Sequence, residues 1–212
     1  MQKVENIDEN PAFAKHVLPA VPSSEVYLED CVTALKRYAD NHFDLAIVDP
    51  PYGIGAGKKS FQSGTRKSYN HTDKDWDAST PTDEYWNELF RVSKNQIVWG
   101  GNYFELPPTR TIICWDKVVM IPTMSQIEIA WTSFDSPARL VKINNTDKNR
   151  FHPTQKPIEL MEYLVKTYTN EGDMVLDNTM GSGTTILAAI KNNRIGIGIE
   201  KEKQYYDVAV RR

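Results

Sequence analysis

Apolar and polar positions change along the chain in short blocks that predict strands and helices in turn. Short apolar runs, typical of strands, lie at residues 26–30, 43–48, 96–99, 111–115, 126–134, 174–177 and 195–199. Residues 139–143 predict one more strand, at a sheet edge. Apolar residues with helical spacing lie between these runs, at residues 31–39, 81–93, 157–168 and 186–190. This alternation favours an α/β fold with a doubly wound, mostly parallel sheet.

The helix predicted at residues 157–168 has a clear apolar stripe. Met161, Leu164, Val165 and Tyr168 follow the i, i+3, i+4, i+7 spacing, and Pro157 would occupy the favoured first position of the helix. We interpret this stripe as part of the core and not as a ligand site.

The predicted elements fit one domain with an extension at the start. Residues 1–25 are polar with scattered prolines and predict an N-terminal arm, and residues 26–212 predict the domain. Its first half runs to about residue 135, and its second half covers about 151–212. Residues 53–80 form a long polar loop without periodicity, which we expect to be mobile and functional. The alternative is an ordinary solvated loop.

Composition favours a globular protein without a membrane span or a metal site. A chain of 212 residues with 40% hydrophobic residues can bury one sizeable core. No apolar stretch approaches the roughly 20 residues of a membrane span, and the acidic start lacks the order of a signal peptide, so we expect a cytoplasmic protein. Cys31 and Cys114 have no metal-ligand spacing, so we expect two buried thiols and no metal. The net charge of −3 restricts any nucleic-acid contact to a local basic patch.

The strand at residues 43–48 leads into the chain's main candidate for chemistry, Asp49-Pro50-Pro51-Tyr52. Consecutive prolines lack N–H groups and present carbonyls, and a carboxylate and an aromatic ring flank them. An exocyclic amine of a planar base suits this arrangement, because it could donate hydrogens to Asp49 and to the Pro50 carbonyl while Tyr52 stacks on the ring. The alternative is a plain turn that ends a strand.

A second segment predicts a site for a nucleotide-type cofactor. The strand at 174–177 ends in Asp177, and a glycine loop follows, Gly181-Ser182-Gly183-Thr184-Thr185. Glycines allow positive φ and close approach of a ligand, and the next helix offers free N–H groups to an anionic group. The next strand ends in Glu200, and 200 − 177 = 23 residues is close to the roughly 20 at which a Rossmann-type unit places its ribose-binding acid.

Four acids are expected at the same edge of the sheet. Asp30, Asp49, Asp177 and Glu200 each follow or end a predicted strand, and ligands of such sheets bind at the carboxyl ends of the strands.

With these motifs, the chain resembles the amino-group DNA methyltransferases that use S-adenosylmethionine, specifically the permuted group whose catalytic motif precedes the cofactor motif. Residues 49–52 resemble the catalytic motif, residues 152–157 (His-Pro-Thr-Gln-Lys-Pro) the segment that opens the first cofactor-side helix, and residues 177–185 the cofactor loop. One departure is Asp177-Asn178-Thr179-Met180, where the family usually has Asp-Pro-Phe before the glycines. The resemblance covers about Val26 to Val210 and implies a Rossmann-like methyltransferase domain with a catalytic first half and a cofactor-binding second half.

The resemblance also implies roles for single residues. Asp49 would orient the target amine and stabilise the positive charge that develops on its nitrogen. Asp30 would contact the adenine of the cofactor and Glu200 its ribose, and the residues near its methionine end would be Gly181, Ser182, Gly183, Thr184 and Lys156. Structural alternatives are an N-cap for Asp30, an exposed charge for Lys156 and a packed turn residue for His152.

DNA is the partner that the resemblance implies. A base inside a duplex cannot reach such a pocket, so it must be flipped out or single-stranded. The loop at 53–80 suits this step, because Lys58, Lys59, Arg66 and Lys67 could contact phosphates. Within the family an aspartate at the start of the catalytic motif favours adenine N6, and a serine favours cytosine N4.

Several alternatives remain open at this point. Cytosine N4, an RNA base or a protein glutamine amide could be the acceptor, or the chain could be a catalytically silent subunit that binds nucleic acid. Only about residues 135–151 stand where the family usually inserts a target-recognition segment. Specificity is therefore either short and loop-borne or shared with a second subunit, in a homodimer or with a specificity partner.

Overall fold

The computed structural model describes residues 23–55, 77–118, 125–145 and 155–212. Most of the predicted arm and most of the loop predicted at 53–80 lie outside these residues. Glu25, which we predicted at the end of the arm, already belongs to the first strand. In the described residues, no helix is long and apolar enough to span a membrane.

The described residues contain eight strands and five α-helices. The strands are β1 (Glu25–Leu28), β2 (Leu45–Val48), β3 (Gln96–Trp99), β4 (Ile112–Asp116), β5 (Ile127–Thr132), β6 (Arg139–Lys142), β7 (Met174–Asp177) and β8 (Ile195–Glu200). The helices are α1 (Cys31–Leu35), α2 (Asp83–Val92), α3 (Ile158–Tyr168), α4 (Thr184–Lys191) and α5 (Lys203–Arg211), with a short 3₁₀ helix at Gly101–Tyr103.

All eight strands form one sheet in the order β1-β8-β7-β2-β3-β5-β4-β6. Only the pairings of β5 with β3 and with β4 are antiparallel, so the mostly parallel sheet predicted from the sequence is confirmed. From β7 the chain continues through α4 to β8, and from β2 it continues through α2 to β3 on the other side of the sheet order. The chain therefore runs in opposite directions along the sheet from β7 and from β2, which are neighbours. Open α/β sheets bind ligands at such a switch point.

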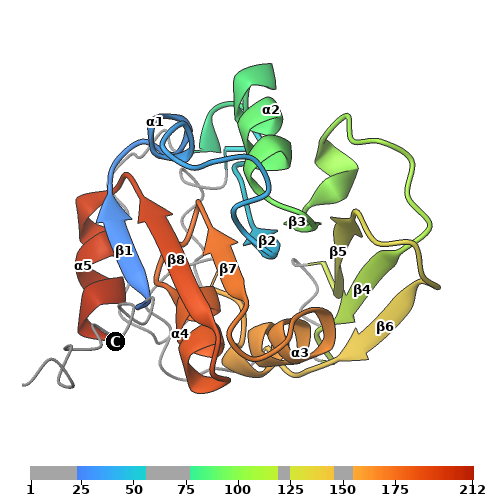
Figure 1. Cartoon of the computed structure of the whole chain (residues 1–212). Helices are drawn as coiled ribbons and strands as arrows, with labels where there is room; N and C mark the ends of the chain where they lie inside the picture. Colours follow the sequence, from blue (N-terminus) through green and yellow to red (C-terminus); the bar gives the residue numbers. More distant parts are fainter. Residues whose placement is uncertain (1–22, 56–76, 119–124, 146–154) are drawn as a thin grey trace, which may run out of the picture.

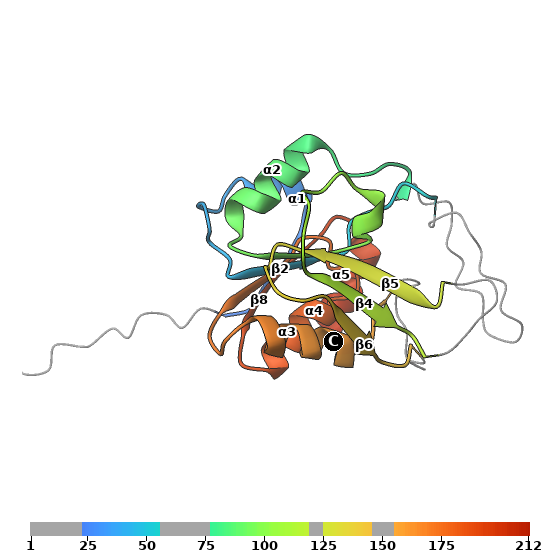
Figure 2. The ribbon, with the colours of Figure 1, turned by 90° about the vertical axis from the view of Figure 1, so that its right-hand side faces the viewer.

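Helices cover both faces of the sheet (Figure 2). On one face α1 and α2 pack on alternate strand residues such as Ala46, Val98 and Leu176. On the other face α3 and α4 pack on residues such as Ile47, Ile97 and Val175. In the α3 stripe Met161, Leu164 and Val165 are buried as predicted, and Tyr168 is partly buried against them.

Several local predictions need correction. α1 ends at Leu35 instead of Ala39, because the guanidinium of Arg91 in α2 donates to the carbonyls of Leu35 and Tyr38. Pro157 is the N-cap of α3 and not its first residue. Cys31 and Cys114 are only partly buried.

The sequence analysis missed α5 completely. This helix packs on β1 and β8 at one side of the sheet (Figure 1), and Tyr205 is the residue of this polar helix that is buried. Tyr205, Val208 and Ala209 follow the i, i+3, i+4 spacing of an amphipathic helix, so the sequence does contain a signal for this helix.

Candidate active site

The four predicted acids meet at one pocket. β1, β8 and β7 end at the same edge of the sheet (Figure 1), and Asp30, Asp49, Asp177 and Glu200 all line a pocket of about 370 Å³ at that edge. Ligand sites in proteins commonly measure about 300–1,000 Å³. The prediction that these acids lie at the same edge is therefore confirmed.

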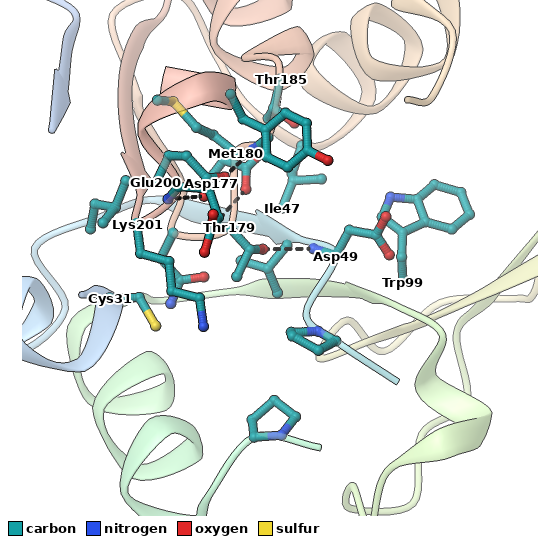
Figure 3. A pocket seen from close by; sticks show the side chains of 18 of the residues that line it. Cys31, Ile47, Asp49, Trp99, Asp177, Thr179, Met180, Thr185, Glu200 and Lys201 are labelled. Atoms are coloured by element: carbon teal, nitrogen blue, oxygen red, sulfur yellow. Dashed lines mark hydrogen bonds between the residues drawn. The ribbon is translucent and has the colours of Figure 1, made fainter. Parts of the chain in front are cut away.

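The turn after β2 is held by side chains from distant parts of the chain. The Asp49 backbone N–H donates to the Thr179 hydroxyl over 3.2 Å, a contact across the β2–β7 switch point (Figure 3). The buried Asp77 carboxylate accepts from the N–H groups of Tyr52 at 2.6 Å and Gly53 at 2.9 Å. All three hydrogen bonds come from backbone N–H groups. They therefore fix the turn without using the Asp49 carboxylate.

The Asp49 carboxylate itself has two partners. The Tyr52 hydroxyl donates to Asp49 Oδ1 over 2.5 Å, and Lys156 Nζ donates to Oδ2 over 2.5 Å. Burial and the neighbouring Asp49 charge raise the pKa of Tyr52 far above its usual range, so Tyr52 remains a donor. Burial works to lower the pKa of Lys156, but Asp49 and Glu128 outweigh it and raise the pKa.

Lys156 lies deep in the pocket, beside Asp49. Only 8% of the residue is exposed, and its ammonium lies 4.9 Å from the centre of the Trp99 ring. Trp99 also lines the pocket, on the side toward which the Asp49 carboxylate points (Figure 3), and its ring N–H has no hydrogen-bond partner among the described residues. The sequence-based alternative of an exposed charge for Lys156 is therefore wrong, and its link to Asp49 was not anticipated.

The Tyr52 ring lies in an aromatic stack. It is nearly parallel to the Tyr103 ring, with the ring centres 4.7 Å apart. Gly100 makes this packing possible, because a Cβ atom there would lie 2.2 Å from a carbon of the Tyr52 ring. Pro51 lines the pocket, Pro50 is buried, and Tyr52 is not among the lining residues. The predicted stacking of Tyr52 on a substrate base remains a prediction.

The glycine loop joins β7 to α4 as predicted. Gly181 and Gly183 have φ angles of 53° and 75°, in the left-handed region that favours glycine. The Ser182 hydroxyl donates to Gln155 Oε1 over 3.1 Å, and Arg212 donates to the hydroxyls of Ser182 and Thr184, both at 3.1 Å. Gly181, Ser182 and Thr184 line the pocket, whereas Gly183 does not.

Asp177 is buried, Glu200 is partly buried, and both accept hydrogen bonds from backbone N–H groups. Thr179 N–H donates to Asp177 Oδ1 over 3.2 Å, and the Glu200 carboxylate accepts from Gly181 N–H at 3.0 Å and Glu202 N–H at 2.8 Å. Burial raises the pKa of Asp177 to about 7, although hydrogen bonds from Thr185 and Thr179 work against the rise. Burial raises the pKa of Glu200 as well.

Asp30 serves as the N-cap of α1. Its Oδ1 accepts from Thr33 N–H over 3.0 Å, which confirms the structural alternative. Asp30 also lines the pocket, so its other oxygen can face a ligand. The neighbouring Cys31 thiol has a pKa raised to about 11 by burial and by the Asp30 charge, which excludes a thiolate nucleophile near neutral pH.

The residues that depart from the family pattern have defined contacts. Thr179 accepts from the Asp49 backbone, as described above. Asn178 is 2% exposed, and its Oδ1 accepts from the hydroxyl of the buried Tyr85 over 3.0 Å. The Asn178 side-chain nitrogen has no hydrogen-bond partner among the described residues, and Asn178 lines the pocket. The departure therefore leaves one buried donor without a partner among the described residues, in a residue that lines the pocket.

Some predicted residues cannot be placed, and some important ones were missed. Lys58, Lys59, Arg66, Lys67 and His152 lie outside the described residues. The sequence analysis did not single out Asp77, Trp99, Glu128 or Arg212. Asp77 lies at the far end of the long loop, and nothing in a single sequence pairs it with residues 52 and 53.

Comparison with known proteins agrees with this geometry. Residues 114–211 match the model of the DNA methylase family N6_N4_Mtase. A type II methyltransferase of Moraxella bovis, M2.MboI, is 24% identical over 88% of this chain and 86% of its own length.

Two solved structures have a similar fold. The complex of M1.HpyAVI with S-adenosylmethionine has a TM-score of 0.59 and 22% identity, over 88% of this chain and 97% of that one. The cytosine-N4-specific PvuII DNA methyltransferase has a TM-score of 0.61 and 16% identity, over 89% and 87%. The family match agrees with the resemblance to amino-group DNA methyltransferases, and the two structures confirm the Rossmann-like fold.

Proposed function

On the basis of this resemblance, we propose that the protein transfers a methyl group from S-adenosylmethionine to the exocyclic amine of a DNA base. The observation that carries the proposal is the position of Asp49. This acid follows Val48 at the end of β2. It lines the same pocket as Asp30, which follows β1, and as Asp177 and Glu200, which end β7 and β8. The motif order of the chain supports the permuted group, since Asp49 precedes the glycine loop.

The lining residues suit S-adenosylmethionine. This cofactor carries a sulfonium, an amino group and two ribose hydroxyls, and the pocket offers the carboxylates of Asp30, Asp177 and Glu200 as acceptors. Free donors are also present, because the side-chain nitrogens of Asn178 and Trp99 are buried without a partner among the described residues. Buried donors of this kind usually have a hydrogen-bond partner, which a ligand can supply.

The proposed reaction needs neither a protein nucleophile nor a metal. The bound cofactor supplies an electrophilic methyl group on sulfur. The amine lone pair forms the new N–C bond, the S–C pair returns to sulfur, and the extra proton on nitrogen leaves to water. Asp49 and the Pro50 carbonyl hold the amine hydrogens, and the Asp49 charge stabilises the positive charge that develops on nitrogen.

Adenine N6 is the acceptor that we favour, because Asp49 opens the catalytic motif. Cytosine N4 is the second candidate, since the fold is shared with a cytosine-N4-specific enzyme.

The target base would be flipped out of the duplex, with Tyr52 as its stacking face. The loop residues Lys58, Lys59, Arg66 and Lys67 remain our predicted phosphate contacts, and a homodimer or a specificity partner remains a prediction too. Such a protein would act in the cytoplasm.

A methyl-transfer assay tests the proposal directly. The full chain is incubated with radiolabelled S-adenosylmethionine and with DNA, RNA or protein, and labelled DNA is digested to nucleosides. We expect label in N6-methyladenine. Label in N4-methylcytosine would replace the favoured base with the second candidate, and label only in RNA or in glutamine would overturn the DNA assignment. Cofactor binding by calorimetry without any transfer would indicate the silent subunit.

A further inference from the structure

Four charged side chains form an alternating row that ends at Asp49. Lys117 Nζ lies 2.7 Å from Glu128 Oε1, Lys156 Nζ lies 3.5 Å from Glu128 Oε2, and Lys156 Nζ lies 2.5 Å from Asp49 Oδ2. Lys117 follows β4, Glu128 lies in β5, Lys156 precedes α3 and Asp49 follows β2. Four separate segments of the chain thus bring two cations and two anions together.

Both lysines of this row are buried. The Lys117 and Lys156 side chains are 8% and 7% exposed, whereas those of Glu128 and Asp49 are 30% and 27% exposed. Burial works to raise the pKa of Glu128, but the two lysines outweigh it and lower the pKa, so Glu128 is ionised near neutral pH. Burying an ammonium is costly unless a close opposite charge compensates it. The row meets this condition with a net charge of zero.

Without Glu128, the positive charge of Lys156 would reduce the electrostatic effect of the Asp49 carboxylate on the reaction centre. Its ammonium donates directly to one of the two Asp49 oxygens. In the proposed reaction a positive charge is present throughout, first on sulfur and then on the amine nitrogen. A cation paired with Asp49 would cancel much of the carboxylate's field at that charge, and a second anion behind Lys156 restores it.

We propose that Glu128 is a positioning residue of the methyl-transfer site, which offsets the charge of Lys156 and so lets Asp49 favour a cationic reaction centre. This inference rests on the proposed function. Glu128 acts through Lys156 and not by contact with the amine. The alternative is a purely structural cluster that ties β4 and β5 to the segment before α3.

Two ligands of nearly equal shape separate these alternatives. S-adenosylmethionine carries the sulfonium charge, and its demethylated product S-adenosylhomocysteine has a neutral sulfur. Calorimetry gives the Kd of each ligand for the full chain and for Glu128→Gln. We expect the ratio of the S-adenosylmethionine Kd to the S-adenosylhomocysteine Kd to rise about tenfold in the variant, and kcat to fall more than the KM for DNA changes. A structural role would change both Kd values alike.

Other variants make the test independent of one substitution. Lys117→Gln removes a positive charge from the other side of Glu128, so we expect the Kd ratio to move in the opposite direction. The double variant Glu128→Gln/Lys117→Gln restores the net charge, and its ratio should return toward that of the unmodified protein. Asp135→Asn is the matched control, because it removes one carboxylate that is exposed and pairs with Arg110 at 3.3 Å. We expect this control to leave the ratio unchanged.

The outcomes separate this inference from the proposed function. If Glu128→Gln binds both ligands with an unchanged ratio, the inference is wrong while the proposed function stands. If Glu128→Gln does not fold, as judged by circular dichroism, the shift in Lys117→Gln decides, and an unchanged ratio there overturns the inference. If the unmodified protein binds neither ligand, the proposed function itself fails, and the inference fails with it.

Discussion

The two walls of the pocket hold their acids in different ways. On the cofactor wall, Asp177 and Glu200 accept from backbone N–H groups that lie 2 to 19 residues away in the sequence. On the catalytic wall, the Asp49 carboxylate accepts from a lysine 107 residues away, and its backbone donates to a threonine 130 residues away. Asp177 and Glu200 are therefore held by nearby backbone groups, whereas Asp49 is held by Tyr52 and also by residues that only the fold brings close.

The walls also differ in charge. Among the described residues no ion pair involves Asp177 or Glu200, and burial raises the pKa of both. Asp49 instead belongs to a row in which each acid has a lysine neighbour. Unpaired acids suit a ligand that itself brings donors and a positive charge. A paired acid suits a group that must keep one geometry before the substrate amine arrives.

The sharpest test of this division is Asp49→Asn. Loss of the charge on the catalytic wall should lower the rate constant for methyl transfer by about 10²–10³-fold or more, the range for removal of one electrostatic transition-state contact. The Kd for S-adenosylhomocysteine should stay within a few-fold, because the cofactor wall is intact. Single-turnover kinetics and calorimetry measure the two quantities. Unchanged turnover would remove Asp49 from the chemistry.

The next test concerns the long-range partner of Asp49. Lys156→Met leaves Asp49 without its buried cation, and we expect the free energy of unfolding to fall by about 2–3 kcal/mol, less than for a fully buried pair because Asp49 is partly exposed. Lys191→Met is the matched control. Its side chain is 58% exposed and its ammonium lies 3.9 Å from Glu162 Oε1, so a loss below about 0.5 kcal/mol is expected. If urea denaturation shows equal losses of unfolding free energy in Lys156→Met and Lys191→Met, the buried Lys156–Asp49 pair does not stabilise the fold.

The same division explains what could be predicted from the sequence. The strand-end acids, the glycine loop and the order of elements follow from local apolar runs and turn residues, and the structure contains them as expected. The contacts of Lys156, Glu128 and Asp77 depend on which strands become neighbours, and a single sequence does not encode that adjacency locally. α5 was missed although Tyr205, Val208 and Ala209 have helical spacing. α1 was predicted too long because Arg91 ends it from another helix.

A smaller effect is expected on the cofactor wall. Glu200→Ala should weaken S-adenosylmethionine by about 1–3 kcal/mol, the range for leaving a buried polar group unpaired. Glu171→Ala is the control, because Glu171 is an exposed acid that does not line the pocket. Calorimetry measures both variants. Equal affinity of Glu200→Ala and the unmodified protein would mean that the ribose assignment is wrong.

The last prediction uses the protonation of Asp177. Its pKa in the folded protein is raised to about 7 from an ordinary value of 3.8, so between these pH values the folded state binds more protons than the unfolded state. Stability must therefore fall as the pH rises through this window, by about 1–2 kcal/mol between pH 5 and pH 7 for this group. Asp177→Asn removes the titration and keeps an acceptor for Thr179 N–H, so its stability relative to the unmodified protein should increase with pH. Urea denaturation at pH 5, 6 and 7 measures this difference. A difference that does not change with pH would show that Asp177 is already charged in the folded state, and a cation would then have to be sought on the cofactor wall as well.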